Sequence, residues 1–317
     1  MPVPDPRIVS LLPSATEIVC ALGLQEHLVG VSHECDFPIG VETLPRVTRT
    51  AIPKGLDSLA IDNTVRELLQ TQAALYHLNE EILAELKPEF IVTQALCDVC
   101  AVSAEEVNSV ACRLPGQPKV INLEPMSLAQ VFETIALLGT ATQRQQQADR
   151  VLQLLQGRVA AVTSRTASIP VTERPRVAIL EWIDPLFNAG HWTPELVSMA
   201  GGIDCLGNAN QPSRQIAAKD LIDSNPDVVF IALCGFDMAR TAEDLPLLKK
   251  IPGWEALRCV QQGWVYYTDG NAYFSRPGPR LVDSLEILAH TLFPHLHPNL
   301  HPNLHASAAV AGKLPSN

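Results

Sequence analysis

Short apolar runs alternate with amphipathic segments over residues 1–126. Four of the runs are rich in β-branched residues and predict strands: 7–12, 28–31, 90–93 and 119–123. Between them, apolar residues recur at helical spacing, and two of these helical segments open on capping boxes, Ser14–Glu17 and Ser103–Glu106. Strands that alternate with helices predict a parallel sheet with crossover helices, so residues 1–126 are expected to form one α/β lobe.

The pattern changes over residues 127–164 and then starts again. This segment has no proline and carries leucine, valine and isoleucine at helical spacing, which predicts one linking helix about 50 Å long at 1.5 Å per residue. Residues 165–293 then predict a second lobe, with three strands, a helix opened by Thr193 and Pro194, and a closing helix at 279–293. The expected fold is α/β, with two Rossmann-like parallel-sheet lobes joined by one long helix and a ligand held between the lobes.

The end of the chain and its composition exclude several classes of protein. Residues 294–317 repeat His-Pro-Asn-Leu twice and predict a mobile tail, either simply solvated or forming a weak surface metal site. The 317 residues carry a net charge of −11, which argues against nucleic acid as a partner. No apolar run reaches the ~18–20 residues that membrane insertion needs. The first residues show no export signal and no lipoprotein-type cysteine, which predicts a cytoplasmic location unless the true start codon lies upstream.

Cysteines and histidines gather after the predicted strands, where parallel sheets bind their ligands. The candidate metal ligands, for zinc or iron, are His33, Cys35, Cys97, Cys100 and Cys234. A Cys-x-x-Cys spacing such as Cys97–Cys100 lets two thiolates reach one metal ion. The same spacing also suits two small buried thiols in a tight turn, and both interpretations stay open.

Aromatic and cationic residues follow the strands of the second half of the chain. They suggest a flat apolar platform for a large planar ligand, or side chains that close the top of the core. The guanidinium groups suit acidic or amide side arms of a ligand, or salt bridges to Asp269 or Asp283. The candidate ligand-binding residues are Ser14, Trp182, Phe187, His191, Trp192, Phe236, Tyr273, Phe274, Arg276 and Arg280. No nucleophile elbow, phosphate-binding loop or His-Glu-x-x-His motif is present, so no enzymatic activity is expected.

Several of these segments resemble the periplasmic cobalamin- and ferric-siderophore-binding proteins of ABC importers. The resemblance spans residues 7–293 and lies in RIVSLLPSATE (7–17), LVGVS (28–32), DFP (36–38), LKPEFIV (86–92) and NPDVVFI (225–231). It implies two lobes of the class III type, and a cobalamin, corrinoid or siderophore-like chelate as ligand. It also implies that Glu81, or its neighbour Glu80, docks on a permease. Lys219 stands where the second docking carboxylate is expected, which argues against an ABC permease as partner.

Three hypotheses follow from the sequence. The first is a cytoplasmic binding protein for a cobalamin-like or ferric chelate. The second is a cytoplasmic metal-binding protein or enzyme that uses Cys35, Cys97, Cys100 and Cys234. The third is an ordinary importer component whose signal lies upstream of the assigned start.

Overall fold

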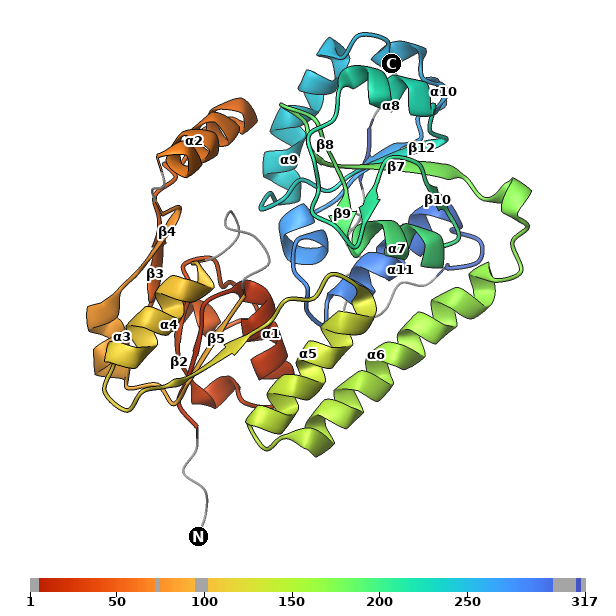
Figure 1. Ribbon diagram of the computed structural model, residues 1–317. Helices are drawn as coiled ribbons and strands as arrows, with labels where there is room; N and C mark the ends of the chain where they lie inside the picture. Colours follow the sequence, from red (N-terminus) through yellow and green to blue (C-terminus); the bar gives the residue numbers. More distant parts are fainter. Residues whose placement is uncertain (1–5, 72–73, 95–101, 299–311, 315–317) are drawn as a thin grey trace. The chain divides into compact units, whose positions relative to one another are not determined.

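The protein divides into two compact units. A computed structural model describes residues 6–71, 74–94, 102–298 and 312–314 (Figure 1). Unit 1 comprises residues 1–56, 60–125 and 129–154, and unit 2 comprises residues 57–59, 126–128 and 155–317. Within the described residues, no helix combines the length and the apolar character that crossing a membrane requires.

Unit 1 is built on a four-stranded parallel sheet with the order β2-β1-β5-β6. Its strands are β1 (Ile8–Ser10), β2 (Leu28–Val31), β5 (Phe90–Thr93) and β6 (Lys119–Asn122), close to the predicted runs. Helix α1 (Pro13–Ala21) covers one face, and α3 (Glu80–Leu86) and α4 (Ala104–Arg113) cover the other (Figure 1). Val9 and Ile91 of the strands pack against Leu83 of α3 and Val107 of α4, which forms the core on that face.

Helices α4 and α1 begin in different ways. Ser103 accepts a hydrogen bond from the backbone N–H of Glu106 (3.2 Å), as the second predicted capping box requires. The first predicted box is wrong, because α1 begins at Pro13 and Ser14 already lies inside the helix, 3 % exposed. Proline suits the first helical position because its fixed φ matches a helix and its missing N–H would have no partner there.

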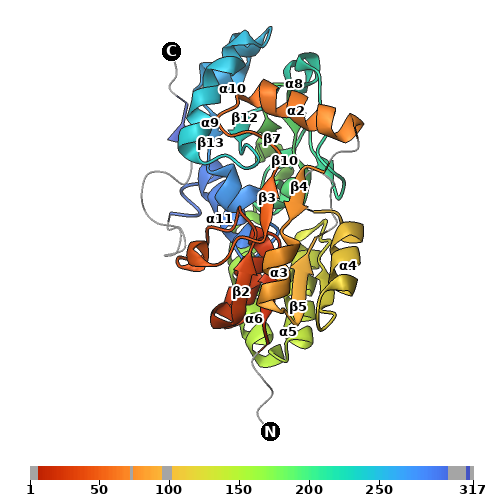
Figure 2. The same ribbon diagram turned by 90° about the vertical axis from the view of Figure 1, so that its left-hand side faces the viewer.

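An antiparallel hairpin in unit 1 has no counterpart in the sequence prediction. Strands β3 (Thr48–Thr50) and β4 (Tyr76–Leu78) pair through Arg49 and His77, and α2 (Ser58–Gln70) lies between them in the chain. Figure 2 shows the two strands side by side. Their sequences, TRT and YHL, are short and largely polar, so they lack the apolar run on which strand prediction depends.

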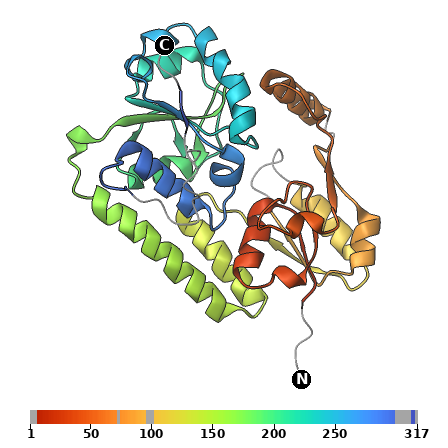
Figure 3. The same ribbon diagram turned by 180° about the vertical axis from the view of Figure 1, so that it is seen from behind.

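The predicted single linking helix is two helices, α5 (Leu128–Ala141) and α6 (Gln145–Thr166). Gln143 takes a left-handed backbone (φ 58°), and the chain reverses there (Figure 3). A Cβ atom on Gly139 would lie 2.5 Å from the Cβ of Ala148, so only glycine lets the two helices approach this closely. The lack of proline was therefore not enough to predict a single helix. The close contact between Gly139 and Ala148 lets the two helices pack against each other on either side of the turn.

Unit 2 contains a second sheet with the order β10-β7-β12-β13-β14, and β8 pairs with β7. The parallel strands are β7 (Arg176–Trp182), β10 (Ile203–Asp204), β12 (Val228–Ile231) and β13 (Val265–Tyr267). Helices α7 (Thr193–Met199) and α11 (Leu281–Leu292) lie together on one face (Figure 1). The remaining helices are α8 (Ala218–Ser224), α9 (Met238–Asp244) and α10 (Arg258–Gln261).

Two short strand pairs complete unit 2. β8 (Phe187–Asn188) runs antiparallel to β7, and β9 (Gly190–His191) pairs with β11 (Asn208–Ala209). Within the tail that was predicted to be mobile, β14 (Gly312–Lys313) adds an antiparallel edge to β13. Helix α7 starts at Thr193, with Trp192 at its cap position instead of the predicted Thr193.

Candidate ligand-binding site

The carboxyl edge of the unit 2 sheet carries a stack of two aromatic rings and a guanidinium group. Trp182 ends β7, and Phe236 lies on the segment after β12; their ring centroids are 4.9 Å apart and tilted by 49°. The guanidinium carbon of Arg240 lies 4.2 Å from the centroid of the Phe236 ring. This close approach is typical of a cation–π contact. The stack places an indole, a phenyl ring and a cation beside one another at the edge where parallel sheets bind ligands.

Helix α9 sets the position of Arg240 in this stack. Asp237 caps the helix by accepting a hydrogen bond from the backbone N–H of Arg240 (2.7 Å). Asp244, one turn further along, accepts a hydrogen bond from the Arg240 side chain (2.9 Å) and is buried. At the other side of the stack, the indole N–H of Trp182 donates to the carbonyl oxygen of Asp184 (3.1 Å). Polar contacts therefore fix the two outer members of the stack.

A second group of candidate aromatic residues lies inside unit 2. Trp192 is 6 % exposed and Phe274 is 3 % exposed. The indole N–H of Trp192 donates to the carbonyl oxygen of Phe274 (2.9 Å), and the Phe274 ring lies 5.5 Å from that of Phe230 in β12. These contacts tie two loops to the core, so in this arrangement Trp192 and Phe274 support the edge from within. Tyr273 and Phe187 are half-buried.

The two candidate arginines also differ in exposure. Arg276 is 3 % exposed and donates to the side-chain oxygen of Asn271 (3.0 Å). Arg280 is half-buried, and its guanidinium carbon lies 5.7 Å from the centroid of the Tyr273 ring. Asp283 forms its ion pair with Arg158, and Asp269 caps the turn at Gly270–Phe274. Of the two arginines, Arg280 is the one with surface available to a ligand side arm.

His191 lies on a tightly packed loop at the same edge. Its backbone is left-handed (φ 52°), and its Nε2 atom is buried with no hydrogen-bond partner among the described residues. Its ring centroid is 5.2 Å from that of Trp192, and burial lowers the pKa of its imidazole. Beside it, the backbone N–H of Gly190 donates to the carboxyl oxygen of Glu181 (3.1 Å). Burial raises the pKa of Glu181 to about 7.

The candidates in unit 1 are held by polar neighbours. Cys35 is buried, and its Sγ atom lies 3.1 Å from the hydroxyl of Thr16 and 3.2 Å from that of Ser32. His33 places its Nδ1 atom 2.7 Å from the hydroxyl of Thr48, and burial lowers the pKa of its imidazole. Thus both predicted metal donors of unit 1 already take part in hydrogen bonds.

The remaining metal candidates do not form a site in the part of the chain that the structure describes. Cys234 is exposed, on the segment after β12 in unit 2. Cys97 and Cys100 fall outside the described residues. Within the described ranges, no three histidine, cysteine, aspartate or glutamate side chains gather in a way that could hold a metal ion. The donor set that the structure describes therefore does not fit a zinc or iron centre.

The predicted docking carboxylate is at the surface of unit 1. Glu81 lies exposed in the first turn of α3, which Asn79 caps by accepting from the N–H of Ile82 (3.1 Å). In unit 2, α8 begins differently: Lys219 pairs with Asp223, and the Asp220 carboxylate accepts from the N–H of Ala217 (2.9 Å). The Asp220 carboxylate is thus engaged by the start of its own helix, whereas Glu81 lies exposed at the start of α3.

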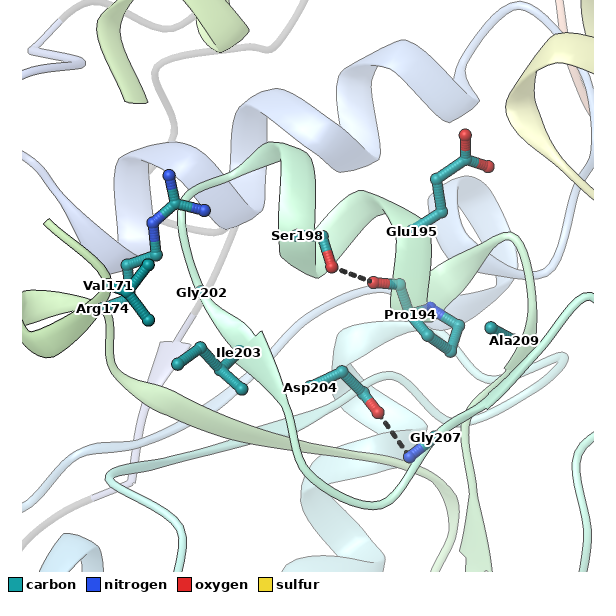
Figure 4. Close-up of a pocket in the computed structure, with 10 residues that line it drawn as sticks. All are labelled: Val171, Arg174, Pro194, Glu195, Ser198, Gly202, Ile203, Asp204, Gly207 and Ala209. Atoms are coloured by element: carbon teal, nitrogen blue, oxygen red, sulfur yellow. Dashed lines mark hydrogen bonds between the residues drawn. The ribbon is translucent and has the colours of Figure 1, made fainter. Parts of the chain in front are cut away.

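A cavity of about 420 Å³ lies elsewhere in unit 2, between α7 and β10 (Figure 4). Its charged lining consists of Arg174, Glu195 and Asp204. Asp204 accepts from the N–H of Gly207 (2.6 Å), and Glu195 accepts from the N–H of Leu128 (3.1 Å), so both carboxylates bind the backbone. None of the predicted ligand residues lines this cavity.

Glu181 and Arg240 are absent from the candidates predicted from the sequence, although both belong to this edge. The signal for Arg240 was its place in the first turn of a helix whose cap, Asp237, directly follows Phe236. The signal for Glu181 was a carboxylate directly after the apolar run 177–180 of β7. Such a residue is buried only with partners that compensate it.

Comparisons with known proteins agree on one family. The family model described as "Periplasmic binding protein" matches residues 8–272. An ABC transporter substrate-binding lipoprotein of Bacillus subtilis is 22 % identical over 291 residues, covering 91 % of this chain and 80 % of the relative. The vitamin B12-binding protein of Vibrio cholerae is 24 % identical over 294 residues, covering 90 % and 88 %.

A solved structure shows the same fold. The periplasmic heme-binding protein of a Roseiflexus species superposes with a TM-score of 0.69 at 22 % identity, covering 92 % of this chain and 99 % of that one. The predicted class of two parallel-sheet α/β lobes is therefore confirmed. The predicted cytoplasmic location is wrong: the relatives are a lipoprotein and a periplasmic protein, which points outside the cytoplasm.

Proposed function

Since the chain belongs to the periplasmic binding protein family, we propose that it is the substrate-binding component of an ABC importer and takes a flat metal chelate of the corrinoid or haem class. The observation that carries the ligand class is the stack of Trp182, Phe236 and Arg240 at the carboxyl edge of the unit 2 sheet. Aromatic faces bury large apolar area against a planar ring, and a guanidinium group suits carboxylate or amide side arms. The names of the relatives, vitamin B12-binding and heme-binding, support the same class.

The family supports the expected absence of catalysis, but it favours the permease partner that Lys219 had argued against and a place outside the cytoplasm. Its members are solute-binding proteins, so the prediction that the chain is not an enzyme is confirmed. We propose that it acts outside the cytoplasm beside an ABC permease, as the name of the Bacillus subtilis relative implies for that protein. Glu81, exposed at the start of α3, is the proposed contact to the permease from unit 1.

The alternative of a metal centre built from protein thiols has less support. Cys35 and His33 are bonded to hydroxyl groups, and the described residues bring no set of three donors together. The metal of the proposed ligand therefore arrives inside its own chelate. We therefore expect neutral side chains and one cation, rather than a cluster of thiolates, to surround the chelate.

The test is a titration of the purified protein with cyanocobalamin and, separately, with haemin. We expect saturable quenching of tryptophan fluorescence and a shift of the absorbance bands with one of these rings. The ring that binds then identifies the ligand as corrinoid or haem. If the folded protein binds neither ring but binds a ferric siderophore such as ferrichrome, the flat-ring class is wrong.

A further inference from the structure

Ser58 contacts the aromatic stack of unit 2, although it is far from the stack in the sequence. Residues 57–59 belong to unit 2, whereas the residues before and after them in the chain belong to unit 1. Ser58 is the first residue of α2 and is fully buried, while Asp57 and Leu59 are exposed. This short segment therefore has one buried side chain with which to bind the rest of unit 2.

Ser58 forms hydrogen bonds at both ends of the stack. Its carbonyl oxygen accepts from the indole N–H of Trp182 (3.3 Å), which also donates to the carbonyl oxygen of Asp184 (3.1 Å). Its hydroxyl donates to the carboxylate of Asp244, which also accepts from the side chain of Arg240 (2.9 Å). Ser58 thus holds one outer member of the stack directly and the other through Asp244.

These contacts form a closed circuit that includes Phe236. The ring centroid of Phe236 lies 4.9 Å from that of Trp182 and 4.2 Å from the guanidinium carbon of Arg240. A chain of hydrogen bonds through Asp244 and Ser58 then leads from the guanidinium group back to the indole. Each member of the circuit is therefore held by two others, and the loss of one contact opens it.

Burial explains why the circuit needs the hydroxyl of Ser58. Asp244 is 4 % exposed, and a buried carboxylate requires hydrogen-bond donors in place of water. Ser58 and Arg240 supply two of them. The indole of Trp182 is half-buried, and its N–H has two carbonyl partners, which restrict its rotation. The stack is thus ordered before any ligand arrives.

We propose that Ser58 is a positioning residue of the ligand site: it holds the Trp182 indole and, through Asp244, the Arg240 guanidinium in the arrangement that a ring ligand meets. This inference rests on the proposed function for the identity of the ligand alone. A ligand that binds side chains already in place does not have to order them, which favours its affinity. Loss of the Ser58 hydroxyl therefore weakens binding while the aromatic and cationic groups themselves remain.

The free protein gives a test that needs no ligand. Ser58→Asp places a second carboxylate against Asp244, and repulsion in this buried place should displace residues 57–59. The Trp182 indole then loses one of its two carbonyl partners and becomes more accessible. Acrylamide should quench the tryptophan fluorescence of Ser58→Asp more strongly than that of the wild type. In a Trp182→Phe background, the same substitution should leave the quenching unchanged.

A rescue variant separates this contact from general damage to the fold. Asp244→Asn removes the repelling charge, and its amide can donate to the carboxylate introduced at position 58 while its oxygen still accepts from Arg240. The double variant Ser58→Asp/Asp244→Asn should therefore return the quenching toward that of the wild type. Urea unfolding of each variant checks that it folds cooperatively.

Binding gives the second test, with cyanocobalamin and haemin as probes. Ser58→Ala should raise the dissociation constant of the ring about three- to tenfold, because Asp244 loses a donor and the segment loses its anchor. Ser58→Asp should raise it further, and adding Asp244→Asn should recover most of that loss. Ser224→Ala is the matched control, since its hydroxyl donates to the carbonyl oxygen of Leu221 (2.8 Å) at the end of α8, before β12 and away from the stack. It should bind within about twofold of the wild type.

The outcomes separate this inference from the proposed function. If neither ring binds the wild type, the proposed ligand class is wrong, and acrylamide quenching still decides the role of Ser58. If Ser58→Asp folds cooperatively and is quenched as the wild type is, the positioning role is wrong. The same conclusion follows if Asp244→Asn does not rescue it, or if Ser58→Ala binds the ring as Ser224→Ala does. Tighter binding by Ser58→Ala would also overturn the inference, because residues 57–59 would then obstruct the site.

Discussion

The carboxyl edges of the two sheets carry comparable chemistry but hold it in different ways. At the edge of unit 1, the hydroxyl of Thr16 bonds to Ser10 (2.8 Å) and lies 3.1 Å from the thiol of Cys35, while His33 bonds to Thr48. At the edge of unit 2, Trp182 and Phe236 place their rings beside each other, and Arg240 lies over the second ring. The edge of unit 1 is thus a closed polar network, whereas the edge of unit 2 is an aromatic stack in which Phe236 is 8 % exposed and Trp182 is half-buried.

This difference shows what decides whether a reactive side chain is a ligand donor. A thiol or imidazole that already has hydrogen-bond partners gives up those bonds when it binds a metal or a ligand. Cys35 and His33 are in that position, whereas a ring ligand can contact the half-buried Trp182 of unit 2 without breaking a hydrogen bond. We therefore expect the binding energy of the ligand to come from the side chains of unit 2, and we expect the polar network of unit 1 to make only its own edge rigid.

The largest expected effect concerns ion pairs, which also differ between the units. In unit 2, Arg158 of α6 bonds to Asp283 and Glu286 of α11, and the exposed fractions of these side chains are 12 %, 8 % and 15 %. Arg158→Ala leaves two carboxylates without their cation in a nearly dry site. We expect the free energy of unfolding in urea to fall by about 3–5 kcal/mol.

Arg113→Ala is the matched change in unit 1. Arg113 pairs with Glu80 at 2.9 Å, but both side chains are more than half exposed, so this variant should lose less than about 1 kcal/mol. Equal losses in the two variants would contradict the distinction between a buried network and a surface pair.

The next effect concerns ligand binding. Trp182→Ala removes the indole from the stack with Phe236 and with it a large apolar area against the ring. We expect the dissociation constant for the ring ligand to rise at least about tenfold, equivalent to about 1.4 kcal/mol. Isothermal titration calorimetry measures it. Trp264→Ala is the control, because Trp264 is 41 % exposed and directly precedes β13, at the amino edge of the same sheet. A similar loss in both variants would mean that the stack is not the binding surface.

Strands and helices were predictable where the pattern of apolar residues is local in the sequence. They were not predictable where a contact between residues distant in the sequence determines the structure. The apolar runs at 28–31 and 90–93 became β2 and β5 because each run is long enough to be buried in a sheet. The break at Gln143 depends on the contact between Gly139 and Ala148 across two helices. The helical spacing of apolar residues does not indicate such a contact. Polar β3 and β4 likewise form through their pairing with each other.

The candidate site divides in the same way. Position after a strand correctly brought Trp182 and Phe236 to the edge of the sheet, because parallel strands end together there. The same argument could not show that the two tryptophans differ in burial. Trp192 is buried, with its indole bonded to Phe274, whereas Trp182 is half-buried. Nor could position after a strand show that Glu181 turns inward to Gly190, since a strand alternates its side chains and burial depends on what covers each face.

A smaller effect compares buried hydroxyl groups in the two units. Thr16→Val keeps the side-chain volume of unit 1 but removes the hydroxyl that joins Ser10 and Cys35. The partners left behind should lower the free energy of unfolding by about 1–2 kcal/mol. Thr241→Val in unit 2 is the matched change, because the Thr241 hydroxyl is buried and has no hydrogen-bond partner among the described residues. It should be neutral or stabilising, and a loss equal to that of Thr16→Val would contradict the idea that unit 1 has the closed network.

The smallest effect concerns the rate at which thiols react, and each unit supplies its own control. Burial raises the pKa of Cys20 in unit 1 to about 12 and that of Cys259 in unit 2 to about 11, whereas Cys112 and Cys234 are exposed. The thiolate is the nucleophile, so at pH 8 iodoacetamide should modify Cys112 and Cys234 well before Cys20 and Cys259. Peptide mapping by mass spectrometry follows each site over time. If Cys20 reacts as fast as Cys112 in the folded protein, helix α1 opens to solvent, and the hydroxyl–thiol network around Thr16 does not give unit 1 the rigidity inferred for it.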